Sequence, residues 1–383
     1  MRIVLGLPNL IDYQQGGGHW TWAFQYPLAL RDVGCEVLCL TAAQTKGDRS
    51  IDESRAFGFI SRIQEHCPGV SCCVILRPKG EQPCLSEDDY YCLRRREFEN
   101  WAKNSDVLWN LGGRIRKPLL DFFPRKVLVD GDPGHFQVSG LQCDVGITDH
   151  QKFLTVGLNL GKNSCQVPLH DRTWTTFPQM LFLDWWKFLP DPGPAAPFTS
   201  LTHWTWEELS WNNRRLSCSK REAYLELVNL PRLSGRCMTL AANLDDPKDK
   251  IGDKRLFESH GWTMVDPWAL ARTPADYQSF IANSRAEICA PKPIYVDLRT
   301  GWLSDRSAGY LATGRPVLMR DTGISENLPT GLGLVTFTTL DEAADKAREI
   351  DANYAKHSKC ARMLAEDLLN SRKVVPRMLD ACR

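Results

Sequence analysis

The sequence alternates short apolar runs with helix-like stretches, and this alternation occurs twice along the chain. The apolar runs lie at residues 2–7, 35–42, 72–78, 106–111, 126–130 and 144–148, and then at 198–204, 237–244, 262–267, 286–292, 316–321 and 331–337. Runs this short, bounded by polar or turn residues, are typical of strands buried in a parallel sheet. The helix-like stretches include 20–34, 219–231, 274–284, 304–314 and 339–359. This alternation predicts an α/β fold of the doubly wound kind.

A proline-rich segment separates the two series of runs. KFLPDPGPAAPFT (187–199) has four prolines and one glycine, which indicates a linker. The length of 383 residues also suits two domains. We therefore predict two Rossmann-like domains, 1–190 and 191–360, and a helical tail, 361–383, that packs back on the first domain. The carboxyl ends of their sheets are expected to face a central cleft, where α/β folds bind ligands.

Composition and charge argue against several function classes. A formal net charge of +1 gives no whole-chain attraction to nucleic acid or to an anionic membrane. No apolar run approaches the ~20 residues of a membrane span. The 14 cysteines are scattered, apart from the adjacent pair Cys72–Cys73, and show no metal-ligand spacing. These features predict a reduced, cytoplasmic protein without a metal site.

The stretch RTGWLSDRSAGYLATGRPV (299–317) places polar and glycine residues at the start of a predicted helix. Ser304 or Asp305 is a suitable N-cap, and the free N–H groups of a helix start attract anions. Arg299 and Arg306 are placed to add charge-assisted hydrogen bonds to a phosphate. Close backbone approach at Thr300 and Gly301, and the flat face of Trp302, would complete a diphosphate and nucleotide site. The alternative is a capped helix with an Arg–Asp pair on the surface.

This stretch and its surroundings resemble the C-terminal half of GT-B glycosyltransferases. They are similar in particular to a little-characterised bacterial glycosyltransferase group with the pattern R-x-G-W-x-S-D-R-S-x-x-Y-L-A-x-G-R-P-V, followed by D-T-G. The matching residues are Arg299, Gly301, Trp302, Ser304 to Ser307, Tyr310 to Ala312, Gly314 to Val317 and Asp321 to Gly323. Two stretches of the first half, Asp132 to Gln137 and Asp149 to Gly161, also resemble that group. The resemblance therefore spans most of both halves.

The resemblance implies that the second domain holds a nucleotide sugar. Lys220 is then expected against the diphosphate, and the turn Asp321, Thr322 and Gly323 is expected to face the transferred sugar. GT-B enzymes often place a ribose-binding glutamate where this chain has Gly309, and Asp305, one helical turn earlier, is the substitute on the same face. The alternatives are a solvated helix lysine at Lys220 and an ordinary Asp-Gly turn at Asp321.

In the first domain the resemblance draws attention to Gly16, Gly17 and Gly18 after the first strand. A tight turn explains three glycines as well as a close approach to a ligand does. His19 is then a candidate general base, oriented by Asp132, because a neutral imidazole accepts a proton near pH 7. Helix capping or packing on nearby tryptophans is the alternative for His19.

Two other features of the first half compete with this assignment. Asp149 and His150 form a second candidate constellation. Asp130-Gly131-Asp132 is a DxD pattern, which binds a metal in the GT-A fold. We discount a GT-A fold because it would leave the second α/β half unexplained, and we predict no metal.

These observations predict a glycosyltransferase of the hexosyl type, with a nucleotide sugar such as UDP-glucose as co-substrate and no other cofactor. The acceptor is a hydroxyl-bearing small molecule or, as an alternative, a modified base in DNA. A non-catalytic protein that binds nucleotide sugars is a further alternative. A base at His19 favours inversion of the anomeric centre, and retention stays open, as do the nucleotide, the sugar and the oligomeric state.

Overall fold

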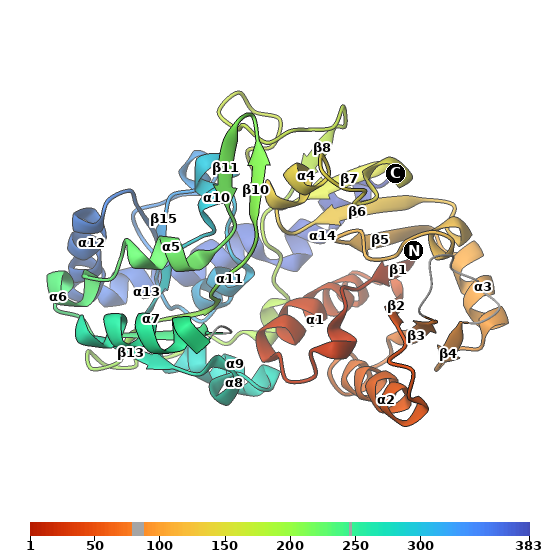
Figure 1. Ribbon diagram of the computed structural model, residues 1–383, viewed down its shortest axis with the longest axis horizontal. Coiled ribbons are helices and arrows are strands. Elements are labelled where there is room, and N and C mark those ends of the chain that lie inside the picture. Colours follow the sequence, from red (N-terminus) through yellow and green to blue (C-terminus); the bar gives the residue numbers. More distant parts are fainter. Residues whose placement is uncertain (79–87, 245–246) are drawn as a thin grey trace.

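The computed structural model describes residues 1–78, 88–244 and 247–383, which form two parallel β-sheets covered by helices (Figure 1). The first sheet has the strand order β4-β3-β2-β1-β5-β6-β7-β8. Its strands are β1 (Arg2–Gly6), β2 (Glu36–Gln44), β3 (Ser71–Arg77), β4 (Asp89–Tyr91), β5 (Val107–Leu111), β6 (Lys126–Asp130), β7 (Lys152–Thr155) and β8 (Trp174–Thr176). All neighbouring pairs are parallel except β3 with β4.

The chain order reverses beside β1, because β2 pairs on one side of it and β5 on the other. Ligands bind at such switch points, outside the carboxyl ends of the strands. The helices of this half are α1 (Gly17–Asp32), α2 (Arg49–His66), α3 (Arg95–Lys103) and α4 (His135–Ser139), with short 3-10 turns η1 (Leu10–Asp12), η2 (Leu119–Phe122), η3 (Ile147–Asp149) and η4 (Leu183–Trp185). Helix α1 therefore starts at the switch point of the first sheet.

The second sheet is parallel throughout, with the order β13-β12-β9-β14-β15-β16. Its strands are β9 (Phe198–His203), β12 (Met238–Asn243), β13 (Trp262–Val265), β14 (Ala286–Cys289), β15 (Val317–Arg320) and β16 (Leu334–Phe337). Its helices are α5 (Lys220–Leu225), α6 (Leu230–Ser234), α7 (Pro247–Ser259), α8 (Pro267–Leu270), α9 (Pro274–Ala282), α10 (Pro293–Asp297), α11 (Asp305–Ala312), α12 (Leu340–Ala352) and α13 (Tyr354–Leu364), with a 3-10 turn η5 (Ile324–Glu326). The predicted α/β architecture is confirmed. The domain boundaries at 190 and 360 stay predictions.

Three predicted elements were wrong in detail. Residues 144–148 form no strand, because Gly146 takes a left-handed φ of 83° and a 3-10 turn follows; the strand is β7, further along. The predicted helix 219–231 divides into α5 and α6, and α6 begins at Leu230 with Pro231 as its second residue. Pro231 has no N–H group to donate to a preceding helical turn, so a break in the predicted helix is expected there. The predicted helix 339–359 ends at Asn353, and α13 starts after it.

An antiparallel hairpin that the sequence pattern did not reveal is inserted between β9 and α5. Its strands are β10 (Glu208–Trp211) and β11 (Arg214–Ser217), joined by Asn212 and Asn213 with φ values of 49° and 57°. Two left-handed residues make the tight turn that hairpins prefer, and asparagine tolerates this conformation. The hairpin reaches the first domain, where Gln142 Nε2 donates to the Ser210 carbonyl.

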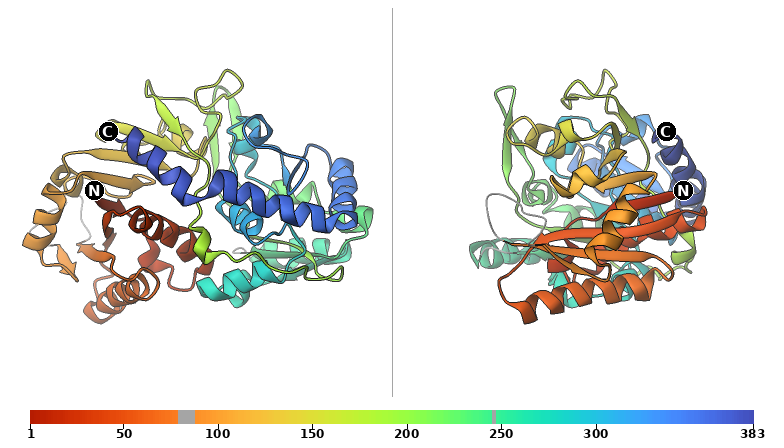
Figure 2. Two further views of the ribbon diagram at one scale, coloured as in Figure 1. Left: turned by 180° about the vertical axis from the view of Figure 1, so that it is seen from behind. Right: turned by 90° about the vertical axis from the view of Figure 1, so that its right-hand side faces the viewer.

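The last segment of the chain runs back alongside the first sheet and α1 (Figure 2). A π-helical turn η6 (Ala365–Leu369) leads into α14 (Ser371–Ala381). Val374, Val375 and Met378 join the same buried apolar cluster as the first sheet and α1. The Trp109 indole N–H donates to Cys382 Sγ at 3.2 Å. None of the helices in the described part of the chain combines the length and the apolar character that a membrane crossing requires.

Candidate functional site

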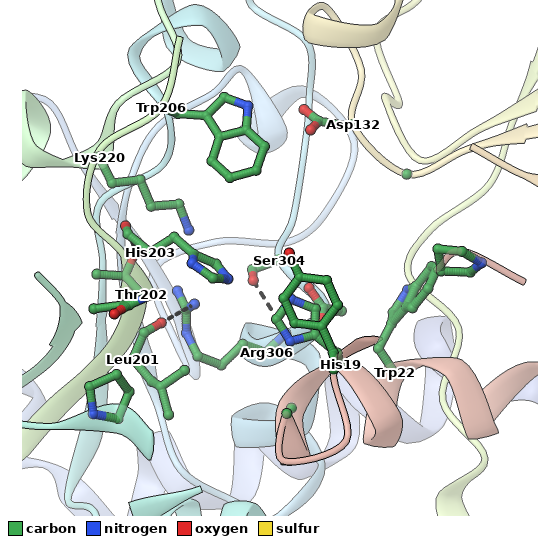
Figure 3. Close-up of a pocket in the computed structure, with 18 of the residues that line it drawn as sticks. His19, Trp22, Asp132, Leu201, Thr202, His203, Trp206, Lys220, Ser304 and Arg306 are labelled. Carbon is green, nitrogen blue, oxygen red and sulfur yellow. Dashed lines mark hydrogen bonds between the residues drawn. The ribbon is translucent and has the colours of Figure 1, made fainter. Parts of the chain in front are cut away.

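A cavity of about 570 Å³ lies between the carboxyl edges of the two sheets. The first domain lines it with the residues after β1 and β6 and with the start of α1; the second domain lines it with the ends of β9 and β12 and the starts of α5, α10 and α11. Figure 3 shows His19, Trp22 and Asp132 facing Lys220, Ser304 and Arg306 across this space. The predicted cleft between two sheets is therefore present.

Helix α11 begins at the cavity. Ser304 is its N-cap, with extended backbone, and its hydroxyl accepts from the Arg306 N–H at 3.2 Å. Asp305, the first helical residue, also lines the cavity. An ideal Cβ on Gly309 would lie 2.7 Å from the ring of Trp186, so a glutamate there would displace this tryptophan. Asp305 is therefore the acid that α11 presents to the cavity.

Lys220, at the start of α5, extends into the same space. Its Nζ lies 5.8 Å from the ring centroid of Trp302 and has no ion pair or hydrogen bond to any residue that the structure describes. Burial and the neighbouring guanidinium of Arg306 lower the pKa of Lys220 to about 8. The indole Nε1 of Trp302 is buried and likewise has no hydrogen-bond partner among the described residues. The ammonium of Lys220 can therefore receive an anionic ligand in the cavity.

Arg306 is buried, and its guanidinium already donates hydrogen bonds to other residues of the protein. Its Nε donates to Glu287, and its Nη1 donates to the Leu201 carbonyl at 2.6 Å. Burial opposes its charge, but Glu287 keeps the pKa of Arg306 above its ordinary value. Arg306 therefore joins α11 to β9 and β14, and contributes a fixed positive charge to the cavity wall.

The other predicted residues of the motif lie outside the cavity lining and contact Asn159, in the loop after β7. The Asn159 side-chain amide donates to the Arg299 carbonyl at 3.1 Å and to the Gly323 carbonyl at 3.0 Å, and its backbone N–H donates to Thr300. Gly301 has a φ of 70° and approaches Asn159 so closely that an added Cβ would lie 2.9 Å from its nitrogen. We call this contact the Asn159 clasp.

The neighbouring side chains are also satisfied by the protein. The Arg299 side chain pairs with Glu326. The Thr322 hydroxyl donates to the Trp302 carbonyl at 2.7 Å, and Asp321 accepts from Gly323 N–H at 2.9 Å. Both turns of the sequence motif thus form a contact between the domains.

The glycine run forms the first turn of α1, which packs against the second domain. Gly16 is the N-cap, and Gly17 N–H donates to the Ala271 carbonyl at 2.9 Å. A Cβ on Gly17 would lie 2.2 Å from the Thr273 carbonyl oxygen, and one on Gly18 would lie 3.2 Å from the Tyr277 ring. The glycines therefore permit this close approach between domains, and they also line the cavity.

His19 follows the glycine run and lines the cavity. Its ring centroid lies 5.4 Å from that of Tyr13 and 5.4 Å from that of His203. Removal from bulk water lowers the pKa of His19, and the Asp305 carboxylate opposes this effect. A neutral imidazole faces the cavity near pH 7.

Asp132 also lines the cavity, but the structure does not pair it with His19. Lys292 Nζ lies 2.6 Å from its carboxylate, the Tyr295 hydroxyl donates to it, and His135 Nδ1 is 3.5 Å away. Burial opposes its charge, but Lys292 lowers the pKa of Asp132. The expected orientation of His19 by Asp132 is corrected accordingly, because Lys292 and Tyr295 of the second domain and His135 of the first domain are the partners of Asp132.

The second candidate pair, Asp149 and His150, makes its contacts within the first domain. His150 Nδ1 donates to the Gly146 carbonyl at 2.7 Å, so its Nε2 accepts from the Asn110 amide at 3.0 Å. Asp149 pairs with Lys117 at 3.2 Å. Neither residue lines the cavity.

In the DxD pattern, the carboxylate of Asp130 accepts hydrogen bonds from the side chains of Gln137 and Thr155, at 2.8 Å each. Burial raises the pKa of Asp130 to about 6.

Several lining residues were not predicted as site residues. His203, Trp206, Trp268, Lys292, Tyr295 and Gln179 all line the cavity. They lie on elements far apart in the sequence and carry no spacing pattern. The one available signal was the placement of His203 and Lys292 at or just after strands of the second sheet, where ligands gather.

Comparison with known proteins supports the fold assignment. No family model and no curated protein sequence matches the chain. HepE of Anabaena in complex with UDP and glucose is similar over 99% of this chain and 98% of its own, with a TM-score of 0.58 and 13% identity. TarM is similar over 100% of this chain and 98% of its own, with a TM-score of 0.55 and 9% identity. AviGT4, a glycosyltransferase involved in avilamycin A biosynthesis, is similar over 100% of this chain and 97% of its own, with a TM-score of 0.54 and 14% identity. The chain therefore has the GT-B fold.

Proposed function

We propose that this chain is a glycosyltransferase that moves a sugar from a nucleoside diphosphate sugar to an acceptor hydroxyl in the cavity. The observation that carries the proposal is the ammonium of Lys220, which has no ion pair to any described residue and faces the same cavity as the start of α11. A cation without an anionic partner, beside the free N–H groups of a helix start, suits a diphosphate. Structures of HepE with UDP and with UDP-glucose support a uridine nucleotide as the first donor to test.

The reaction requires the bond between the anomeric carbon and the diphosphate oxygen to break. The electron pair leaves with the diphosphate, whose growing negative charge is stabilised by Lys220 and the start of α11. The acceptor oxygen forms the new bond to the anomeric carbon, and its proton passes to a base. His19 is proposed as that base, because its lowered pKa keeps it neutral and it faces the cavity.

Asp305 is proposed to accept hydrogen bonds from the ribose hydroxyls, since Gly309 offers no side chain there. The Asn159 clasp holds the far end of the same loop, and so fixes Trp302 and Ser304 relative to the first domain. Arg299 and the turn at Asp321 are left outside this mechanism.

A thermal-shift screen of nucleotides and nucleotide sugars tests the proposal. A ligand that binds only the folded protein stabilises it by about 2.7 kcal/mol at a hundred times its Kd. We expect UDP to raise the unfolding midpoint of the wild type and of Arg299→Gln, and to have little effect on Lys220→Met. The proposal fails if no nucleotide shifts the wild type, or if Lys220→Met responds as the wild type does.

Release of UDP from the bound nucleotide sugar separates an enzyme from a binding protein. We expect slow release without acceptor and faster release with one. His19→Gln, which keeps a polar side chain but removes the base, should lower the rate while the UDP-induced shift is kept.

A further inference from the structure

The first-domain wall of the cavity contains an amide, that of Gln179, which makes no hydrogen bond to any described residue and opens onto the cavity. Among the described residues the buried asparagines and glutamines are Gln25, Asn110, Gln137, Asn159 and Gln179. In four of them the side-chain oxygen and nitrogen both have protein partners. Gln179 is only 5% exposed, yet its side chain makes no hydrogen bond to any described residue. Neither amide atom is fully buried, so both are accessible from the cavity, and the amide of Gln179 is available to a ligand there.

Gln179 lies where an acceptor would enter the reaction. It follows β8, in a segment that runs along α1, because the Phe182 N–H donates to Gln25 at 2.8 Å. Trp22, one helical turn before Gln25, lines the same cavity and is half-buried, with its ring edge-on to Tyr26. Lys220 and the start of α11 lie on the opposite, second-domain side (Figure 3).

An amide beside a flat indole suits a sugar ring. The amide offers two donors and one acceptor oxygen in a plane, which match neighbouring hydroxyl groups. The indole face offers an apolar surface to the C–H face of the ring. An anionic nucleic-acid backbone, by contrast, requires a strip of cations. This wall includes Arg114, but Asp132 also lies there.

We propose that Gln179 determines acceptor specificity, and that the acceptor is a carbohydrate whose hydroxyls bind Gln179 while its ring stacks on Trp22. This inference rests on the proposed glycosyl transfer.

The matched variants are Gln179→Met and Gln25→Met, which replace an unsatisfied and a satisfied amide by a side chain of similar size. Gln179→Met should unfold at the wild-type midpoint or above it, because no protein hydrogen bond is lost. Its UDP-induced shift should be unchanged, whereas kcat/KM for a saccharide acceptor should fall at least tenfold. Gln25→Met should unfold at a lower temperature and keep the wild-type acceptor preference.

The assay uses the nucleotide sugar that gives the largest thermal shift and measures nucleotide release. The acceptor panel contains methyl glycosides of glucose, galactose, mannose and N-acetylglucosamine, a flavonoid phenol, and an oligonucleotide with a 5-hydroxymethylated pyrimidine. Stimulation by a saccharide that is lost in Gln179→Met supports the inference.

Three results would overturn it: stimulation only by the phenol or the oligonucleotide, no response to any saccharide, or wild-type kinetics in Gln179→Met. A wild type that binds nucleotide but ignores saccharides rejects the carbohydrate acceptor alone. A wild type that binds no nucleotide rejects the proposed function and this inference together.

Discussion

The two ends of the loop between α10 and α11 have opposite polar environments. At the Asn159 clasp, the side-chain amide of Asn159 is fully buried and every polar atom has a partner in the protein. At the cavity end, Lys220 Nζ and Trp302 Nε1 have no hydrogen-bond partner among the described residues. The comparison separates two uses of polar groups. Those satisfied within the chain hold the domains together, and those left open are available to a ligand.

The largest expected effect is on stability at the clasp. Asn159→Leu keeps the volume of the side chain but leaves the buried carbonyl of Gly323 and the partly buried carbonyl of Arg299 without these donors. Each buried group left unsatisfied costs about 1–3 kcal/mol, so we expect the free energy of unfolding to fall by about 3–4 kcal/mol. Urea denaturation measures this change. A loss below about 1 kcal/mol would show that the clasp contributes little.

The next effect is on binding at the cavity end. Lys220→Met should weaken UDP about a hundredfold, or about 2.7 kcal/mol, because a charge-assisted contact to the diphosphate is removed. The variant should be at least as stable as the wild type without ligand, because Lys220 has no ion pair to a described residue and burial disfavours its charge. Calorimetric titration gives the Kd. An unchanged Kd would place the diphosphate elsewhere.

The third effect is on the pH dependence of UDP binding. The pKa of Lys220 is about 8 without ligand, so the ammonium form is present below that pH. Above it, binding must first protonate Lys220, and affinity should fall up to about tenfold per pH unit. The stability of the protein without ligand depends on pH in the opposite direction. Folding lowers the pKa of Lys220 from 10.5 to about 8, so the contribution of Lys220 to the free energy of unfolding rises with pH between 8 and 10.5. Titrations from pH 7 to pH 9.5 should show the fall in the wild type and its absence in Lys220→Met.

The smallest effect is expected at Arg299. Its side chain is 47% exposed, and its ion pair with Glu326 is at the surface, so Arg299→Gln should cost less than about 1 kcal/mol of stability. UDP affinity should stay within about twofold of the wild type. A loss of UDP affinity comparable to that of Lys220→Met would indicate that Arg299 does contact the diphosphate.

Local patterns in the sequence were sufficient to predict the fold. Apolar runs of the right length and a proline-rich break led to the two parallel sheets, because strand burial depends on neighbouring residues. The errors lie where local preference was overridden, as at Gly146, whose left-handed backbone ends the predicted strand 144–148. The hairpin β10–β11 was missed because its strands are short and polar.

The candidate site was less predictable, since it depends on contacts across the two domains. Ser304 was predicted because a helix start attracts anions, and Lys220 was predicted from the resemblance; both line the cavity. The partner of Asp132 is Lys292, 160 residues away, and no local pattern connects them. Gln179 carries no motif, and only its amide, which opens onto the cavity without a hydrogen bond to any described residue, identifies it.

The crossing of α14 onto the first sheet has a consequence for biosynthesis. Translation proceeds from the N-terminus, so helix α1 and the strands of the first sheet emerge from the ribosome long before α14, which packs against them. Until Val374, Val375 and Met378 are made, one apolar face of the first half stays exposed to water. The apolar core of the N-terminal half is therefore completed last. A chain interrupted after the second sheet would present the uncovered face to chaperones and proteases.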